Sequence, residues 1–177
     1  MIQMRDSQSK EGLLKLIMYF NHFRSTKNST MIEIGSYAGE STTIFAKYFK
    51  KVIAIDPFIN NYDKNAVACR EENFDAVYRV FLQGLKKNTN ILHIKQLSND
   101  AFSLIKEPIH FVYIDGNHTY DQVKMDICNY INLIPVGCFI GGHDYVSGWE
   151  GVINAVNEVL GTPDALFNDG SWIKRKV

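Results

Sequence analysis

The sequence predicts an α/β domain built on a mostly parallel sheet with helices on both faces. Three observations support this prediction. Helical and strand patterns alternate along the chain, five short buried strands precede a terminal hairpin signal, and a glycine-containing loop follows the first strand. The length of 177 residues suits one domain with its own core, so we expect a single domain over residues 1–177.

The elements follow from the spacing of apolar residues, taken in chain order. Helical spacing predicts helices at 10–24, 41–49, 74–85, 100–105, 120–134 and 152–160. Short apolar runs predict strands at 30–34, 51–55, 91–94, 110–114 and 136–140. Two extended pieces, 165–167 and 171–174, flank an Asn-Asp-Gly turn, which indicates a hairpin and brings the count to seven strands. We expect residues 1–28 to form a helical cap and the polar segment 59–73 to act as a lid.

Composition excludes several classes of protein. The formal net charge is zero, whereas a nucleic-acid-binding domain calls for a strong basic excess. No apolar run approaches the roughly 20 residues of a membrane span. Cys69, Cys128 and Cys138 show no paired spacing, so a reducing cytoplasm is the simplest compartment. We therefore expect a small-molecule partner, neither nucleic acid nor membrane, and leave a homodimer open.

The loop after the first strand has the features of a nucleotide-like cofactor site. Gly35 and Gly39 let the backbone turn sharply and approach a ligand, although an ordinary strand-to-helix loop has the same appearance. Asp56 ends the second strand about twenty residues later, where a carboxylate can accept both ribose hydroxyls. Together, the loop and this acid predict cofactor binding.

The charge of the loop indicates which cofactor it holds. The glycines are spaced G-x-x-x-G, no Lys or Arg lies in the loop, and Glu33 and Glu40 flank it. A pyrophosphate seeks the positive end of a helix, and Glu40 would repel it there. S-adenosylmethionine carries a sulfonium and an ammonium group and suits this acidic loop. A dinucleotide-dependent oxidoreductase is therefore disfavoured, and a non-catalytic S-adenosylmethionine-binding protein remains an alternative.

Three segments resemble a known family. MIEIGSYAGESTTIFAKYF with VIAIDPF resembles the first motifs of class I S-adenosylmethionine-dependent methyltransferases. FVYIDGNHTYDQVKMDI and GGHDY with GWEGVINAVNEV resemble the small-molecule O-methyltransferase-like branch called methyltransferase family 24. The resemblance covers 31–160. It implies a Rossmann-like doubly wound seven-stranded fold with an antiparallel last strand, and methyl transfer to a hydroxyl of a small molecule or sugar.

The resemblance also implies the cofactor contacts. The methionine part would lie against Glu33, Gly35, Ser36 and Gly39. Asp56 would hold the ribose, Pro57 and Phe58 would lie on the adenine side, and Ser98, Asn99 and Asp100 would contact the adenine. Asp115, at the end of the fourth strand, would face the reacting methyl group.

The same resemblance identifies candidate catalytic residues at two neighbouring strand ends. Asp115-Gly116-Asn117-His118 resembles the D-x-x-K segment of metal-dependent O-methyltransferases, with His118 in place of lysine. His143 and Asp144 stand where that family has an Asp-Asn pair. A metal site at Asp115, His143 and Asp144 would hold Mg²⁺ or, given the histidine, a transition metal. Without a metal, neutral His118 or His143 would accept the proton of the hydroxyl.

Overall fold

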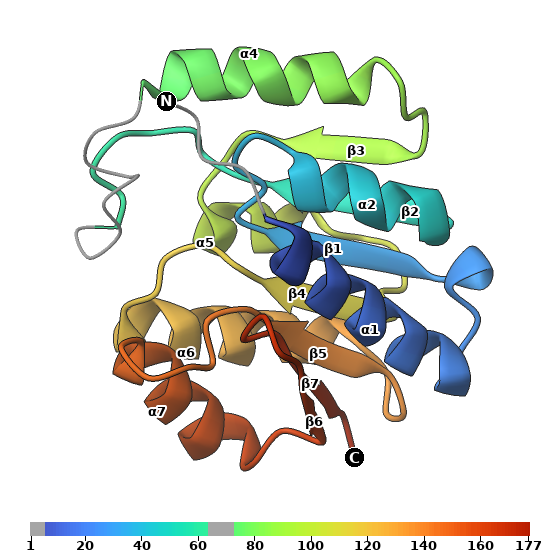
Figure 1. Cartoon of the computed structure of the whole chain (residues 1–177), viewed down its shortest axis with the longest axis vertical. Coiled ribbons are helices and arrows are strands. Elements are labelled where there is room, and N and C mark those ends of the chain that lie inside the picture. The colour runs from blue at the N-terminus through green and yellow to red at the C-terminus, as the bar shows by residue number, and fades with distance from the viewer. Residues whose placement is uncertain (1–5, 64–72) are drawn as a thin grey trace.

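The computed structural model describes residues 6–63 and 73–177, which form one seven-stranded sheet (Figure 1). The strand order is β3-β2-β1-β4-β5-β7-β6. The first five strands are parallel, and β7 runs antiparallel between β5 and β6. The strands are β1 (Thr30–Ile34), β2 (Lys51–Ile55), β3 (Ile91–Ile94), β4 (Phe111–Ile114), β5 (Phe139–Gly142), β6 (Ala165–Leu166) and β7 (Trp172–Arg175).

Helices of the described residues cover the two faces of this sheet. One face carries α1 (Ser7–Phe23), α2 (Glu40–Tyr48) and α4 (Phe74–Leu85). The other carries α5 (Ser98–Ala101), α6 (Tyr120–Tyr130) and α7 (Glu150–Leu160). Short 3-10 turns lie at Thr26–Asn28, Phe102–Leu104 and Ile131–Leu133. Side chains that accept backbone N–H groups start two of the helices, Asp6 at α1 and Asn73 at α4.

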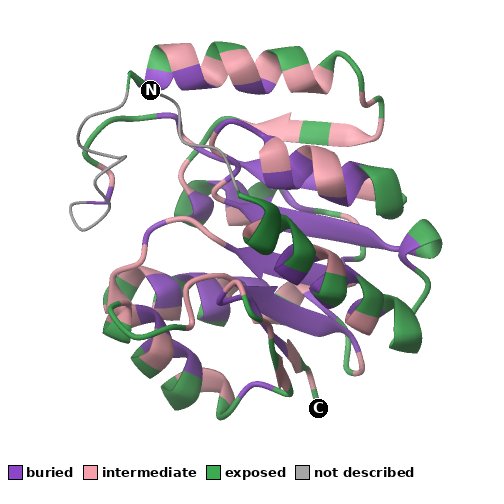
Figure 2. Cartoon of the chain, in the orientation of Figure 1, coloured by how far each residue is buried: buried purple, intermediate pink, exposed green. Residues whose placement is uncertain are grey.

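The core lies on both sides of the sheet because alternate strand residues point to opposite faces. Ile32 and Ile34 of β1 pack with α6 and α7, whereas Met31 packs with α1 and α2. Figure 2 shows the central strands buried along their length, as a parallel sheet covered on both faces requires. The ends of neighbouring strands stay in register, with Ile34 opposite both Ile55 and Ile114. The loops that follow these strands therefore meet at one edge of the sheet.

The predicted fold class and terminal hairpin are confirmed, and most element boundaries differ by one to four residues. The fifth strand spans Phe139–Gly142 instead of 136–140, because a turn at Pro135 precedes it and Gly137 adopts a φ of +84°. The short helix begins at Ser98, two residues earlier than predicted, and tightens into a 3-10 turn.

Two predicted segments are only partly described. Within the proposed cap, α1 packs Leu13, Leu16, Ile17 and Phe20 into the core, and its first residues lie at the pocket described below. Of the proposed lid 59–73, residues 64–72 lie outside the described part of the chain. Over 6–63 and 73–177, no helix has both the length and the apolar character that crossing a bilayer requires.

Candidate active site

The loop after β1 needs glycine at two positions. A side chain at Gly35, where φ is +87°, would place its Cβ 2.0 Å from the backbone oxygen of Asp115. At Gly39, where φ is +82°, a Cβ would lie 2.8 Å from the ring of Phe81. Gly39 caps α2, so the helix points its N-terminus at the loop. Gly35 thus lets the ends of β1 and β4 approach, Gly39 lets the loop pack against α4, and both leave the backbone of this loop accessible to a ligand.

Asp56 joins the loops that follow β1 and β2. Its carboxylate accepts the backbone N–H of Tyr37 at 2.8 Å and that of Phe58 at 2.7 Å. Burial raises the pKa of Asp56, and these two N–H groups act against that rise. Both donors lie at positive φ, 45° for Tyr37 and 52° for Phe58, a backbone strain that is common at ligand sites. The side chain still borders the pocket described next, where a ribose can reach its free lone pairs.

A pocket of about 590 Å³ opens at this edge of the sheet. The hydroxyl of Ser36 is buried there without a hydrogen-bond partner among the described residues, so it can receive a polar ligand group. The predicted residues that line the pocket are Gly35, Ser36, Asp56, Pro57, Ser98, Asp115, His118, His143 and Asp144.

Five predicted cofactor residues lie outside this lining. Glu33 is buried and accepts a hydrogen bond from the hydroxyl of Thr42. Gly39 forms the turn, and Phe58 packs behind the pocket with the helix α4. Asn99 and Asp100 are exposed on the first turn of α5. These residues surround the pocket rather than form its surface.

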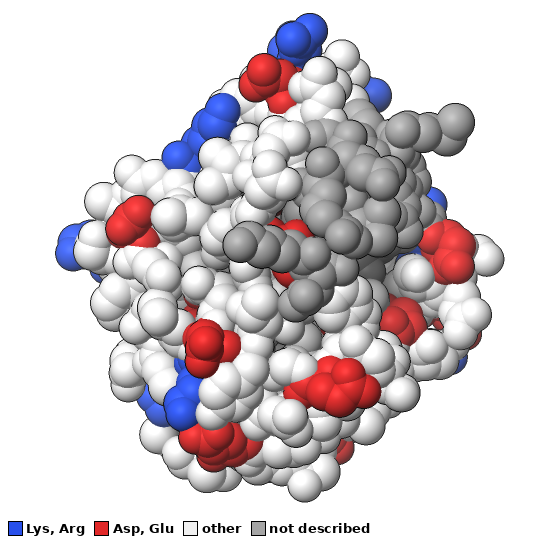
Figure 3. Space-filling view, turned by 90° about the vertical axis from the view of Figure 1, so that its left-hand side faces the viewer, with Lys and Arg blue, Asp and Glu red and all other residues white. Residues whose placement is uncertain are grey.

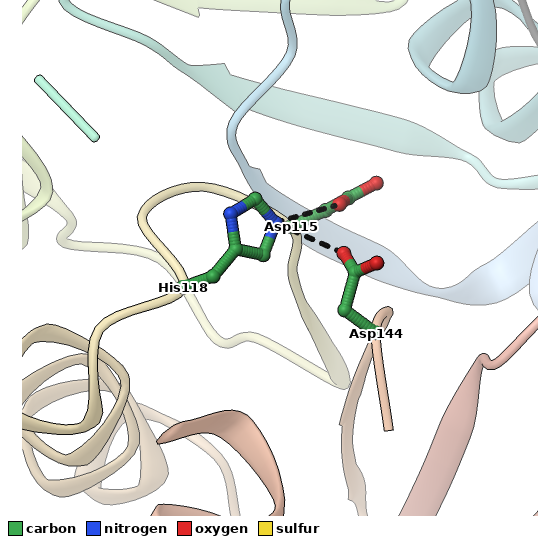
Figure 4. Close-up of side chains that lie close together, drawn as sticks. All are labelled: Asp115, His118 and Asp144. Carbon is green, nitrogen blue, oxygen red and sulfur yellow. Dashed lines mark ion pairs between the residues drawn. The ribbon is translucent and has the colours of Figure 1, made fainter. Parts of the chain in front are cut away.

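His118 directs the Nε2 side of its ring at the carboxylates of Asp115 and Asp144 (Figure 4), and its Nδ1 side faces Asp63. Its Nε2 is 2.9 Å from Asp144 Oδ2 and 4.0 Å from Asp115 Oδ1. Its Nδ1 is 2.6 Å from Oδ2 of the buried Asp63, which also accepts the backbone N–H of His118 at 2.9 Å. Burial lowers the pKa of His118, but the hydrogen bonds to Asp115, Asp144 and Asp63 outweigh it and raise the pKa to about 12. This raised pKa favours the protonated imidazole of His118 at neutral pH, so His143 is the better candidate for the neutral proton acceptor expected from the sequence.

His143 approaches the same carboxylates from the end of β5. Its Nδ1 is 3.1 Å from Asp144 Oδ2 and 4.0 Å from Asp115 Oδ1, and its Nε2 is 3.8 Å from Asp169 Oδ2. Asp144 itself adopts a φ of +60°. Burial raises the pKa of Asp144, and the two histidines lower it to well below its usual range. The centre thus combines the carboxylates of Asp115 and Asp144 with the imidazole rings of His118 and His143.

Three donor atoms are arranged so that they could bind a metal ion. Ligand atoms of Asp115, His118 and Asp144 lie within 4.8 Å of one another. The predicted set had His143 in the place of His118. Asp63 lies on the Nδ1 side of His118 and can accept a hydrogen bond from Nδ1–H. The lone pair of Nε2 would then be available to an ion.

Sequence reasoning missed several residues of the site. Asp63 and Tyr62 fall in a polar segment without a recognisable motif, and Asn117 fixes that segment by donating to the Tyr62 carbonyl at 2.7 Å. Trp149 also lines the pocket, and its ring lies 4.4 Å from that of His118. His93 does not line the pocket and packs against the rings of Phe58 and Phe81.

The charge around this edge matches the expectation from the loop. Figure 3 views the molecule from the side where the parallel strands end, and acidic side chains are spread across it, with Lys and Arg mainly toward the margin. The described lining contains five carboxylates, which include Asp6 and Glu40, together with two histidines and no Lys or Arg. Such a pocket suits a ligand with a positive end more than a pyrophosphate.

Comparison with known proteins agrees with this geometry. A family model described as a methyltransferase domain matches residues 32–145. An uncharacterised protein of Acanthamoeba polyphaga mimivirus is 30% identical over 148 residues, which are 74% of this chain and 59% of that relative. The chain therefore spans about three fifths of the length of the curated relative that it matches.

Solved structures share the fold at low sequence identity. A TDP-rhamnose 3′-O-methyltransferase of calicheamicin biosynthesis is 14% identical, with a TM-score of 0.67 over 97% of this chain and 81% of that one. The O-methyltransferase from Bacillus cereus in complex with S-adenosylhomocysteine is 15% identical, with a TM-score of 0.64 over 97% and 81%. Since the family model covers more than half of the sequence, the chain belongs to this family of methyltransferase domains.

Proposed function

We propose that this chain transfers the methyl group of S-adenosylmethionine to a hydroxyl of a small molecule or sugar. One observation carries the proposal. The same pocket joins the glycine loop and Asp56 to the centre formed by Asp115, His118, His143 and Asp144. The cofactor and the acceptor can therefore meet at the end of β4. The two solved relatives named above carry O-methyltransferase in their names, which agrees with a hydroxyl acceptor.

The chemistry needs few groups from the protein. The acceptor oxygen attacks the methyl carbon, the bond from carbon to sulfur breaks, and S-adenosylhomocysteine leaves as a neutral thioether. The protein aligns the two reactants, excludes water and takes the hydroxyl proton. We assign the proton to the neutral form of His143, because three carboxylates hold the proton of His118. The imidazolium of His118 then stabilises the negative charge that develops on the acceptor oxygen.

We further propose that a divalent cation can bind Nε2 of His118 in place of the proton. The donor set of one imidazole nitrogen and two carboxylates fits a transition-metal ion better than Mg²⁺. Asp115, His118 and Asp144 would hold the ion, and Asp63 would orient His118 from behind. When bound, such an ion supplies a Lewis acid that lowers the pKa of the acceptor hydroxyl.

Calorimetry and an acceptor screen test this function. We expect the protein to bind S-adenosylhomocysteine and to methylate at least one alcohol in a panel of sugars, phenols and polyols. Binding without turnover on the whole panel would favour a non-catalytic cofactor-binding protein. Binding of NADH with no binding of S-adenosylhomocysteine would overturn the assignment in favour of an oxidoreductase.

A chelator distinguishes a centre that needs a metal ion from one in which the His118 imidazolium acts alone. If an ion is required, EDTA abolishes turnover, leaves S-adenosylhomocysteine affinity nearly unchanged, and added Mn²⁺ restores the rate. If EDTA has no effect on turnover, the cation proposal is wrong, and the His118 imidazolium acts in its place.

A further inference from the structure

A carboxylate at the tip of the C-terminal hairpin lies behind the candidate active site. Asp169 belongs to the turn between β6 and β7, far along the chain from the other residues of the centre. Its side chain is fully buried, and its Oδ2 lies 3.8 Å from Nε2 of His143. Asp169 is not among the described residues that line the pocket, so it faces the reaction centre through the ring of His143.

The position of Asp169 is fixed from two directions. Its Oδ1 accepts the backbone N–H of Ser171 at 3.0 Å, and its Oδ2 accepts the Ser171 hydroxyl at 2.9 Å. On the other side lies α1, where a Cβ at Gly12 would come within 2.1 Å of Asp169 Cγ. Glycine inside a helix is about 1 kcal/mol less favourable than alanine. The glycine is needed here because the carboxylate occupies the space that a side chain would take. Gln8 Nε2 also donates to the Asn168 carbonyl at 3.2 Å, which ties α1 to the same turn.

The two ring nitrogens of His143 have different surroundings. Nδ1 faces the centre, 3.1 Å from Asp144 Oδ2 and 4.0 Å from Asp115 Oδ1, and both of these acids line the pocket. Nε2 is buried from solvent and faces Asp169. An acceptor hydroxyl in the pocket therefore reaches the ring from the Nδ1 side. To take the proton of that hydroxyl, the neutral ring must carry its lone pair on Nδ1 and its own proton on Nε2.

Asp169 favours this tautomer. A proton on Nε2 points at a buried carboxylate, whereas a bare Nε2 would place its lone pair against the same negative charge. The described donors to Asp169 are a backbone N–H and a hydroxyl, which do not neutralise its charge. The competing acceptor at Nδ1, Asp144, is shared with His118, whose Nε2 lies closer at 2.9 Å. The 3.8 Å contact is longer than a hydrogen bond, and such contacts commonly tighten once the reactants bind.

We propose that Asp169 is a positioning residue that holds the proton of neutral His143 on Nε2, so that Nδ1 accepts the proton of the methyl acceptor. The inference rests on the proposed function, in which His143 is the base. The acceptor loses its proton to Nδ1, its oxygen attacks the methyl carbon, and the bond from carbon to sulfur breaks. Asp169 touches neither reactant and acts by selecting one tautomer of the ring.

Asp169→Asn tests this selection with almost no change of shape. Because the Ser171 N–H donates to Oδ1, the amide oxygen should keep that position and the NH₂ group should replace Oδ2. The NH₂ group then donates to Nε2, so the proton of His143 should move to Nδ1. ¹⁵N NMR of histidine-labelled protein measures this, because protonated and bare ring nitrogens resonate far apart. The spectra are recorded with EDTA, and the His143 signals are those missing from His143→Gln.

Activity provides a second readout. Asp169→Asn should lower kcat at least ~100-fold on an acceptor from the panel, and leave the acceptor KM and S-adenosylhomocysteine affinity within about threefold. Gly12→Ala displaces the same carboxylate from the side of α1. It should also move the proton to Nδ1 and lower kcat, and it replaces Asp169→Asn if that variant does not fold. Asp121→Asn removes a carboxylate from an exposed position of α6 and should change neither readout.

The tautomer separates positioning from a purely structural role, which would not reverse it. A wild-type ring with its proton on Nδ1 would overturn the inference. So would a folded Asp169→Asn or Gly12→Ala protein that keeps the wild-type tautomer or the wild-type kcat. A wild-type protein that methylates no acceptor of the panel would instead overturn the proposed function.

Discussion

Replacing Asp126 with asparagine should change how the stability of the protein depends on pH. Asp126 is fully buried, and its Oδ2 has no hydrogen-bond partner among the described residues. Burial raises the pKa of this carboxyl from 3.8 to about 6, although the hydrogen bonds from Ser98 and Gln122 act in the opposite direction. Asparagine keeps the shape and an acceptor oxygen but does not titrate. The variant therefore isolates the cost of the buried charge.

The sign of the effect follows from the two states of the chain. Between pH 3.8 and about 6 the folded protein holds a proton on Asp126 that the unfolded chain has lost. Stability contributed by this proton is present at low pH and is lost as the pH rises through the folded pKa. The raised pKa changes the free energy of unfolding by about 3 kcal/mol over the whole titration. About 2 kcal/mol of this change occurs between about pH 4.5 and 7.5.

Urea unfolding of both proteins at these two pH values measures the effect. The free energy of unfolding of Asp126→Asn minus that of the wild type should increase by about 2 kcal/mol from the acidic to the neutral value. Taking this difference cancels the titration of all other groups. Asp121→Asn should show no such change. A difference that stays constant within about 0.5 kcal/mol would refute the raised pKa and the burial argument behind it.

Three other changes test the cofactor loop and the cation centre. Asp56→Ala should weaken S-adenosylhomocysteine binding by about 1.5–3 kcal/mol in calorimetry, while the exposed Asp75→Ala should not. Gly35→Ala should lower the free energy of unfolding by at least about 2 kcal/mol in urea, because its Cβ would overlap the Asp115 carbonyl; wild-type stability would contradict this close approach of the two loops. Asp63→Asn should weaken Mn²⁺ binding about 10–100-fold, and unchanged affinity would argue against its support of His118.

The fold could be predicted because each of its signals is local. Apolar periodicity identifies helices and strands within a few residues, and the Asn-Asp-Gly turn identifies the terminal hairpin. The errors lie at boundaries. Strand β5 begins at Phe139 because the chain first turns at Pro135 and Gly137, and apolar residues such as Val136 resemble a strand although they precede it.

The site was only partly predictable because some of its contacts join distant residues. The family resemblance placed Asp115, His118, His143 and Asp144 at two neighbouring strand ends, and the structure brings them together. The charge of His118 was not predictable, because it depends on Asp63, which lies 55 residues away in a segment without a motif. The position of Asp126 beside the pocket could not be predicted for a similar reason. It sits at an inward position of a helix, and only its contact with Ser98, 28 residues earlier, shows its relation to the pocket.

A crystal structure with S-adenosylhomocysteine would test the central claim most directly. The account predicts the ribose hydroxyls at Asp56, the purine beside Ser98, and the sulfur at the end of β4, facing Asp115 and His143. The acceptor would then have its place between that sulfur and His143. A ligand bound outside this pocket, or bound within it with the purine at Asp115 and the sulfur at Ser98, would contradict the proposed active site.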